Sequence, residues 1–215
     1  MNQAPQHYDQ TEEESLLEEY NTRVAAVFCA QIVDAVEILV DECAENLRSK
    51  EGNPDSDVHH LFKQGTPTEL YDSICTYVLR LVVLLFAEER MLLPVQNSQY
   101  QKKYSLTQLA KQLQKTPPLL RQGSYSIFTQ ILSMTSVIHS GIEEDGCTLF
   151  PHGGTLFSNE QTSIFTGALK ISDEAVHSIL MKLRYIGDEK IDYCMLYVEN
   201  LGSMYELLME LHIDN

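Results

Sequence analysis

One apolar segment between two prolines constrains the fold of this chain more than any other feature. It lies between Thr66 and Pro94. Threonine is a capping residue, proline is favoured at the first helical position, as at Pro67, and Pro94 cannot continue a helix. Between these limits large apolar residues recur at helical spacing, and residues 78–86 are apolar nearly all round. The segment therefore predicts one buried helix at the centre of a helical domain.

A membrane span is the alternative interpretation of the same segment. Its uninterrupted apolar run is well short of the roughly 18 residues that a span needs, because Arg80 and the charged residues 88–90 interrupt it. We therefore predict a core helix and no membrane contact.

Charge is distributed unevenly along the 215 residues. No Asp or Glu occurs between Arg90 and Ile142, and this acid-free window carries +6, so the rest of the chain must carry −22 to reach the net charge of −16. Such acidity disfavours a wholly basic nucleic-acid-binding module. The five cysteines are scattered without a C-x-x-C pair, and no basic-then-apolar leader opens the chain. Both features predict a cytoplasmic protein.

Capping residues and apolar periodicity predict a mainly α, irregular multi-helix domain with at most a small two-stranded ribbon. Residues 1–65 are expected to form a long acidic helix, from Thr11 to about Arg48, and a polar loop that contains His59 and His60. Residues 66–215 are expected to form a helical domain in one compact unit with them. Its further helices are expected at residues 105–116, 126–142, 173–183 and 198–211, with a strand or extended link at 190–193.

Four stretches, in order, resemble the helical region that precedes the catalytic domain in adenine-specific DNA methyltransferases. Similar regions occur in type II (IIG-like) restriction-modification enzymes and in the methyltransferases of BREX and DISARM phage-defence systems. The stretches are residues 77–94 (with A-E-E-R-M-L-L-P at 87–94), Y-S-L at 104–106, G-G-T-L-F at 153–157, and I-D-Y at 191–193 leading to L-G-S-M-Y-E at 201–206. The family pattern has Tyr, Asp and Gly where this chain has Phe86, Glu89 and Met91.

The resemblance implies a role without catalysis in this chain. Family members continue into a Gly-rich S-adenosylmethionine-binding loop and an N-P-P-Y/F motif for the flipped adenine, and neither motif occurs in these residues. We therefore expect no catalytic, cofactor-binding or metal-binding residue here. The expected partners are a methyltransferase domain, in cis or in trans, that binds S-adenosylmethionine, and duplex DNA. Two alternatives are a free-standing acidic protein that mimics DNA and a helical adaptor whose first helix binds a partner.

The acid-free window supplies candidates for contact with the DNA backbone. Basic side chains bind phosphate without reading sequence, and here they alternate with glutamine and tyrosine. The candidates are Lys102, Lys103, Lys111, Lys115 and Arg121. A solvated surface that balances the acidic helices is the alternative.

The remaining candidates are structural. Arg80 lies among apolar residues, so we expect a carboxylate partner from another helix. Glu88 and Arg90 are interpreted as a polar clamp that ties the helix end to neighbouring loops. Gly153 and Gly154 are expected to adopt positive φ before Leu156 and Phe157 enter the core, and Gly202 to allow close helix approach. Tyr205 and Glu206 are further residues of the family motif.

Overall fold

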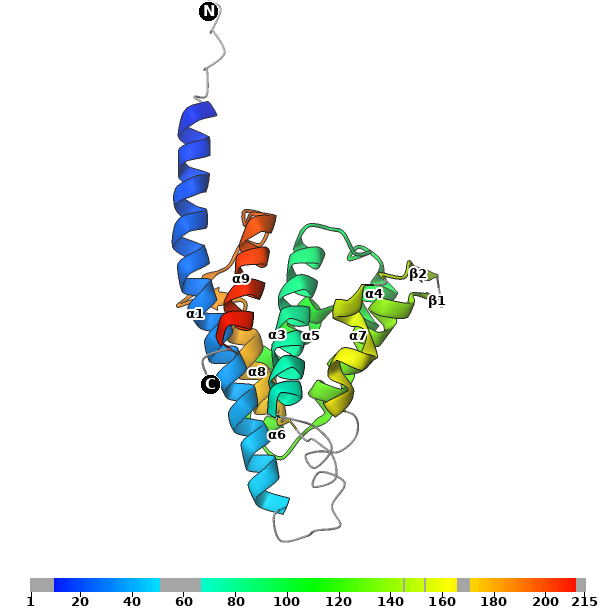
Figure 1. The fold of residues 1–215 in the computed structure, drawn as a ribbon. Helices are drawn as coiled ribbons and strands as arrows, with labels where there is room; N and C mark the ends of the chain where they lie inside the picture. The colour runs from blue at the N-terminus through cyan, green and yellow to red at the C-terminus, as the bar shows by residue number, and fades with distance from the viewer. Residues whose placement is uncertain (1–9, 51–66, 145, 153, 166–170, 212–215) are drawn as a thin grey trace, which may run out of the picture.

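The computed structural model describes residues 10–50, 67–144, 146–152, 154–165 and 171–211. These residues form eight α-helices, two 3₁₀-helices and two short antiparallel ribbons (Figure 1). The prediction of a mainly α, irregular multi-helix domain is therefore confirmed, with two small ribbons rather than one.

The first helix, α1 (Gln10–Lys50), is 41 residues long, which corresponds to about 60 Å. It lies along one side of the domain, and its first turns project beyond the other helices (Figure 1). The apolar stripe that predicted it is buried, for example at Phe28, Ile32 and Leu39, against α3, α8 and α9. The predicted loop with His59 and His60 lies outside the described residues, as does Thr66.

The central helix, α3 (Pro67–Glu89), begins at Pro67, as predicted. It contacts α1, α5, α9 and both 3₁₀-helices, and side chains on all its sides are buried, including Ile74, Val78, Leu81 and Leu85. Residues 68–89 are long and apolar enough to cross a membrane, but most of their apolar stretch is buried inside the domain. Burial on every side is the arrangement of a core helix.

The end of α3 differs from the prediction, because the helix stops at Glu89 rather than near Pro94. The N–H of Leu92 donates to the carbonyl of Ala87 at 2.9 Å, and the N–H of Met91 donates to that of Glu88 at 3.1 Å. This pair of bonds is the Schellman motif, in which the residue after the helix takes a left-handed conformation. Met91 does so with φ 55°, at the position where the family pattern has glycine.

Four helices lie in the acid-free window. Two were predicted: α5 (Leu106–Lys115), capped by the Ser105 hydroxyl, and α7 (Ser126–Ser140). Two short ones were not, namely α4 (Ser98–Lys103), where a loop was expected, and α6 (Pro118–Arg121). The side chain of Asn97 starts α4 by accepting from the N–H groups of Gln99 and Tyr100, and proline at the first position suits α6.

The two ribbons are hairpins. Strands β1 (Ile142–Glu144) and β2 (Cys147–Leu149) pair where a loop was predicted, and Gly146 reverses the chain with φ 75°. Strands β3 (Tyr185–Ile186) and β4 (Glu189–Lys190) form the second ribbon just before the predicted extended link. The 3₁₀-helices η1 (Thr155–Phe157) and η2 (Asn159–Phe165) lie between them in sequence.

The bounds of the last two helices agree with those predicted from the sequence. Helix α8 (Asp173–Lys182) begins after Ser172, whose hydroxyl accepts from the N–H of Ala175, and α9 (Val198–Leu211) has the predicted limits. Helix α8 packs on α1, α5 and α7, and α9 packs on α1 and α3. The resulting core surrounds α3 and places its charged residues against three separate loops.

Candidate functional site

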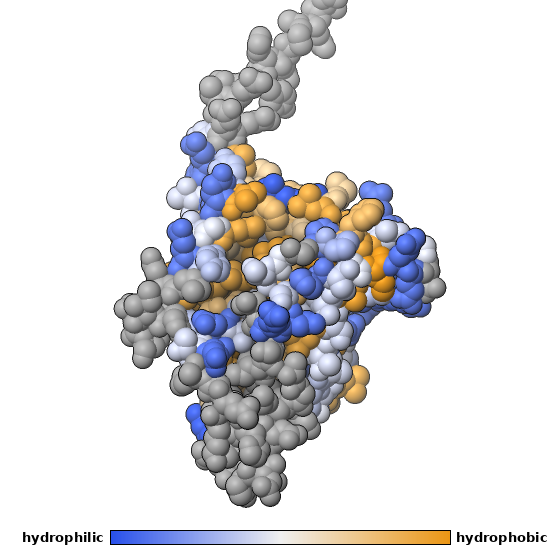
Figure 2. Space-filling model, turned by 45° about the vertical axis from the view of Figure 1, so that its right-hand side comes forward, coloured by the Kyte–Doolittle hydropathy of each residue, from blue (hydrophilic) through white to orange (hydrophobic). Residues whose placement is uncertain are grey.

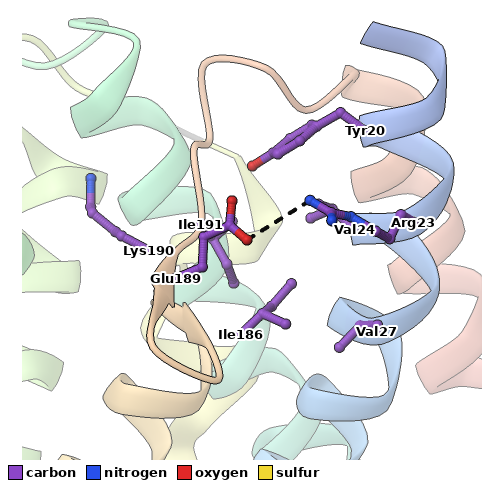
Figure 3. Close-up of a pocket in the computed structure, with 8 residues that line it drawn as sticks. All are labelled: Tyr20, Arg23, Val24, Val27, Ile186, Glu189, Lys190 and Ile191. Atoms are coloured by element: carbon purple, nitrogen blue, oxygen red, sulfur yellow. Dashed lines mark ion pairs between the residues drawn. The ribbon is translucent and has the colours of Figure 1, made fainter. Parts of the chain in front are cut away.

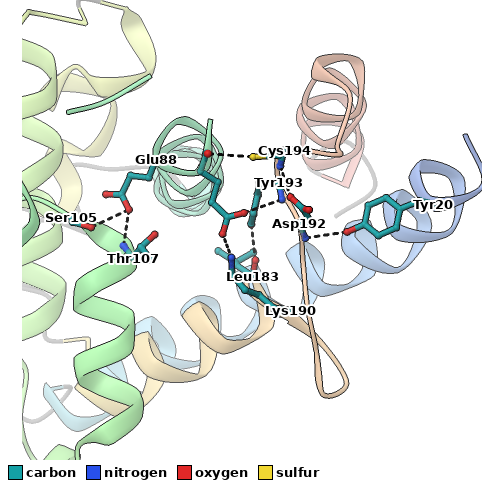
Figure 4. Close-up of polar contacts among 10 residues, drawn as sticks. Tyr20, Glu88, Ser105, Thr107, Leu183, Lys190, Asp192, Tyr193 and Cys194 are labelled. Carbon is teal, nitrogen blue, oxygen red and sulfur yellow. Dashed lines mark hydrogen bonds and ion pairs between the residues drawn. The ribbon is translucent and has the colours of Figure 1, made fainter. Parts of the chain in front are cut away.

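Glu88, in the last turn of α3, is 4% exposed and accepts four hydrogen bonds. The donors are the hydroxyls of Tyr100 and Ser105, at 3.0 and 3.2 Å, and the N–H groups of Leu106 and Thr107, at 2.7 and 2.9 Å. Figure 4 shows the bonds from Ser105 and Thr107. These N–H groups open α5, where a helix favours a negative charge. Glu88 therefore fixes the start of α5 to the end of α3.

Tyr100 remains a hydrogen-bond donor to Glu88 over the physiological pH range. Burial raises the pKa of its phenol, and the neighbouring Glu88 carboxylate raises it further. The buried hydrogen bond that joins α4 to α3 therefore persists over this pH range.

Glu89 and Arg90 hold the segment that links β4 to α9. The Glu89 carboxylate pairs with Lys190 and accepts from the N–H of Tyr193 at 3.2 Å. The Arg90 guanidinium donates to the carbonyls of Tyr193, Cys194 and Leu196, at 3.4, 3.1 and 2.5 Å. It also lies over the Phe86 ring, 4.4 Å from the centroid, in a cation–π contact. The predicted polar clamp of Glu88 and Arg90 is therefore present in the structure, and Glu89 belongs to it.

Arg80 is fully buried, but the prediction that it pairs with a carboxylate from another helix is wrong. Its guanidinium donates to the carbonyls of Leu156 and Ser158, both at 2.6 Å, and to the hydroxyl of Thr162 at 2.9 Å. Burial among these neutral acceptors lowers the pKa of Arg80 to about 10. This pKa is still well above neutral pH, so the guanidinium stays charged. Neutral acceptors suffice because they satisfy the N–H groups without a second buried charge.

The charged residues of α3, with Arg90 just after its end, therefore join all four stretches that carry the family resemblance. Arg80 bonds to the G-G-T-L-F stretch, Glu88 to the Y-S-L stretch, and Glu89 and Arg90 to the I-D-Y stretch. We call these four side chains the α3 clamp. The bonds link segments up to 106 residues apart in sequence.

The five DNA-backbone candidates divide into three groups. Lys102, Lys111 and Lys115 are exposed, on α4 and one turn apart on α5. Lys103 pairs with Glu144 of β1 at 3.1 Å. The expectation for Arg121 is wrong: its side chain is 6% exposed and bonds to the Glu174 carboxylate at 2.7 Å and to the carbonyls of Leu113 and Thr116.

The glycine expectations are also corrected. Gly153 lies outside the described residues, and Gly154 is extended with φ −113° rather than positive. Leu156 is half-buried and Phe157 is buried, as expected. Gly202 is exposed, and a Cβ added there would meet nothing within 4 Å, so it permits no close helix contact.

Tyr205 and Glu206 are exposed on α9. Tyr205 lines an open pocket of about 450 Å³ with Asp72, Thr76, Leu79 and Thr155. The pocket lies between α3, η1 and α9 and brings together residues of the central helix and two family stretches. Within the residues that the structure describes, no group of three His, Cys, Asp or Glu side chains is placed to hold a metal ion.

A smaller pocket of about 120 Å³ lies between α1 and the β3–β4 ribbon (Figure 3). Its wall is apolar, with Val24 and Val27 of α1 opposite Ile186 and Ile191. At its mouth Arg23 and Glu189 form an exposed ion pair at 3.8 Å. Sequence reasoning missed this pocket, because nothing in the sequence predicts that the ribbon lies against α1.

Sequence reasoning also missed Asn21, which is 4% exposed inside the stripe of α1. Its amide donates to the carbonyl of Met195 at 2.8 Å and accepts from the N–H of Tyr197 at 3.0 Å. An asparagine at a core-facing helical position, four residues after Leu17, is a signal that could have identified it. It fixes α1 to the segment that the α3 clamp holds from the other side.

Comparison of the chain with protein-family models, with curated proteins and with solved structures gives no match.

Proposed function

We propose that this chain is a non-catalytic helical scaffold and DNA-positioning domain of an adenine-specific DNA methyltransferase or type II restriction-modification enzyme. The catalytic domain and its S-adenosylmethionine site lie outside these residues in this proposal. The observation that supports it best is the α3 clamp, because each family stretch is bonded to the charged residues of one helix. The residues that carry the resemblance thus hold a scaffold together, which is the role the family assigns to this region.

The exposed lysines support the DNA-positioning part of the proposal. Lys102, Lys111 and Lys115 lie in a window without acidic residues and are available to phosphate oxygens. The net charge of −16 opposes DNA binding by the isolated chain. Repulsion from distant charges is screened over about 8 Å at physiological salt, so these lysines act once another domain delivers the DNA.

The test of the proposal is the pattern of genomic N6-methyladenine in the source organism. In-frame deletion of the sequence that encodes these residues should abolish methylation at one recognition sequence, and the wild-type sequence should restore it. An unchanged methylation pattern would overturn the proposal. The purified chain should show no S-adenosylmethionine binding by calorimetry, and micromolar affinity would place the cofactor site inside it.

The positioning role is tested by replacing the three lysines with glutamate in the complete enzyme. The variant should bind cognate and random duplexes more weakly by about the same factor, and its affinity should depend less on salt, because fewer counterions are released. Arg48→Glu, an exposed charge reversal at the far end of α1, is the matched control. Normal affinity and salt dependence in the triple variant would make the window a solvated surface only.

A further inference from the structure

Exposed apolar side chains gather at the end of the molecule where α3 stops and α9 begins. They are Met91 (67%), Leu16 (66%), Leu92 (63%), Val198 (58%) and Met195 (41%). Figure 2 shows apolar surface gathered in this region, next to the first described turns of α1. We call these five side chains the apolar end. Monomeric proteins rarely expose a large contiguous apolar surface without a use for it.

Hydrogen bonds hold the three elements of the apolar end together. Arg90, next to Met91, donates to the carbonyl of Leu196, and Asn21 of α1 donates to that of Met195. The projecting turns of α1 rise beside this surface (Figure 1). Leu16 belongs to these turns, since α1 begins at Gln10. The backbone that carries these apolar side chains is therefore held in place by part-buried hydrogen bonds, which gives a preformed surface.

The pocket of Figure 3 continues this surface along α1. Leu16 is one turn before Tyr20, and Tyr20, Arg23 and Val27 line the pocket, so all four lie on one side of the helix. The hydroxyl of Tyr20 accepts from the N–H of Asp192, which joins the pocket rim to the segment before α9. At about 120 Å³ the pocket has room for one large apolar side chain.

The charges around the apolar end are acidic. Glu18, Glu19, Asp192 and Glu199 are exposed, and none of them forms an ion pair with any residue that the structure describes. Of the nearby basic residues, Arg23 and Lys190 are paired with Glu189 and Glu89, and Arg90 donates to main-chain carbonyls of the segment before α9. An apolar surface with an acidic rim complements one with a basic rim.

We infer that the apolar end binds a protein partner whose apolar contact side chains are surrounded by lysine and arginine, with one of them inserted into the pocket beside α1. This inference rests on the proposed scaffold role, since a scaffold acts by holding another protein. A second copy of this chain would place acid against acid, and nucleic acid or an anionic membrane would meet the same repulsion.

The test uses the purified chain and an amphipathic helical peptide of about 18 residues made of leucine and lysine. Fluorescence anisotropy at about 0.15 M salt measures its binding. We expect the double variant Leu92→Ser, Val198→Ser to bind the peptide at least about tenfold more weakly. Because both side chains are exposed, the variant should fold normally, which circular dichroism and thermal unfolding check.

The matched control is Leu119→Ser, Leu120→Ser, which removes an even more exposed apolar pair on α6, away from the acidic rim. It should bind the peptide as the wild type does, and a leucine–glutamate peptide should not bind either protein. Equal binding by both double variants would show attraction by net charge alone and would overturn the inference, as would the absence of binding. Self-association by light scattering that the Leu92→Ser, Val198→Ser variant loses would assign the surface to a second copy. None of these outcomes depends on genomic methylation.

Discussion

The α3 clamp and the acid-free window lie next to each other in sequence but use charge in opposite ways. In the clamp, Arg80 and Glu88 are buried, and all four side chains bond to other segments of the chain. In the window, Lys102, Lys111 and Lys115 point to solvent. A charge therefore fixes this fold where other segments supply its hydrogen-bond partners, and it is available to a ligand where it points to solvent.

Among substitutions in the α3 clamp and in the acid-free window, replacement of Glu88 should have the largest effect on stability. Glu88→Ala leaves four donors without their acceptor and removes the anchor of α5. We expect a loss of about 3–5 kcal/mol in the free energy of unfolding, measured by urea denaturation. Glu206→Ala, at an exposed position on α9, is the control. A loss below about 1 kcal/mol would mean that water satisfies the same donors.

Arg121 belongs to the acid-free window by sequence, but its side chain is buried and bonded to other segments like those of the α3 clamp. Arg121→Met should lower the free energy of unfolding by about 2–3 kcal/mol, since it removes bonds to the carbonyls of Leu113 and Thr116 and to Glu174. Lys111→Met, in the same window, should change the free energy of unfolding by less than about 0.5 kcal/mol. Equal effects of the two substitutions would remove the distinction.

The ion pair of Arg121 and Glu174 predicts that stability depends on pH. The hydrogen bond from Arg121, aided by its charge, lowers the pKa of Glu174 below its ordinary value of 4.5. Since the folded pKa lies below the unfolded one, this stabilisation is present above pH 4.5 and is lost as pH falls through the folded pKa. The stability difference between wild type and Arg121→Met should therefore narrow in acid, although the carbonyl bonds remain. Urea denaturation at neutral and acidic pH measures it.

Met91 follows Arg90, the last residue of the clamp, and its replacement by glycine should give a gain in stability. Its φ of 55° is strained for a residue with a Cβ, and its side chain is exposed. Met91→Gly should therefore stabilise the chain by about 1 kcal/mol, seen as a higher midpoint of thermal unfolding. Leu92→Gly, one residue later, is the control and should give no gain. A lower midpoint for Met91→Gly would show that the Met91 side chain contributes contacts that outweigh the strain.

The lysines should have the smallest effect on stability. Replacing Lys102, Lys111 and Lys115 together by alanine should leave the free energy of unfolding within about 0.5 kcal/mol of wild type, because none of the three is buried. Urea denaturation checks this. A larger loss would show that the window contributes to the fold and would weaken its assignment to DNA.

Local signals predicted most of the helices. Ser105 and Ser172 cap α5 and α8 as their sequences suggest, and the stripe of α1 is buried as its periodicity requires. The β1–β2 hairpin was missed although Asp145-Gly146 is a strong hairpin signal, because only four apolar or β-branched residues of its short strands flank it. Helix α4 was missed because six polar and aromatic residues give no apolar period.

The partners of buried charges could not be predicted in the same way. The sequence indicated that Glu88 and Arg90 would bind neighbouring loops, but it did not indicate which ones. The acceptors of Arg80 are mainly backbone carbonyls in η1 and just after it, and a carbonyl leaves no signal in the sequence. The burial of Arg121 depends on Glu174, which is 53 residues away in sequence. Such contacts arise from the way that distant helices pack, so a pattern of nearby residues cannot reveal them.

The α3 clamp also bears on how sequences with this fold can diverge. Arg90 donates only to main-chain carbonyls among the described residues, and Arg80 and Glu88 each bind main-chain groups as well. Every amino acid supplies a carbonyl, so the loops that receive these bonds can exchange their side chains while the bonds persist. Drift would then erase the loops first and leave a few charged positions on one helix. A search for distant relatives should therefore fix the spacing of Arg80, Glu88 and Arg90 and leave the loops unconstrained.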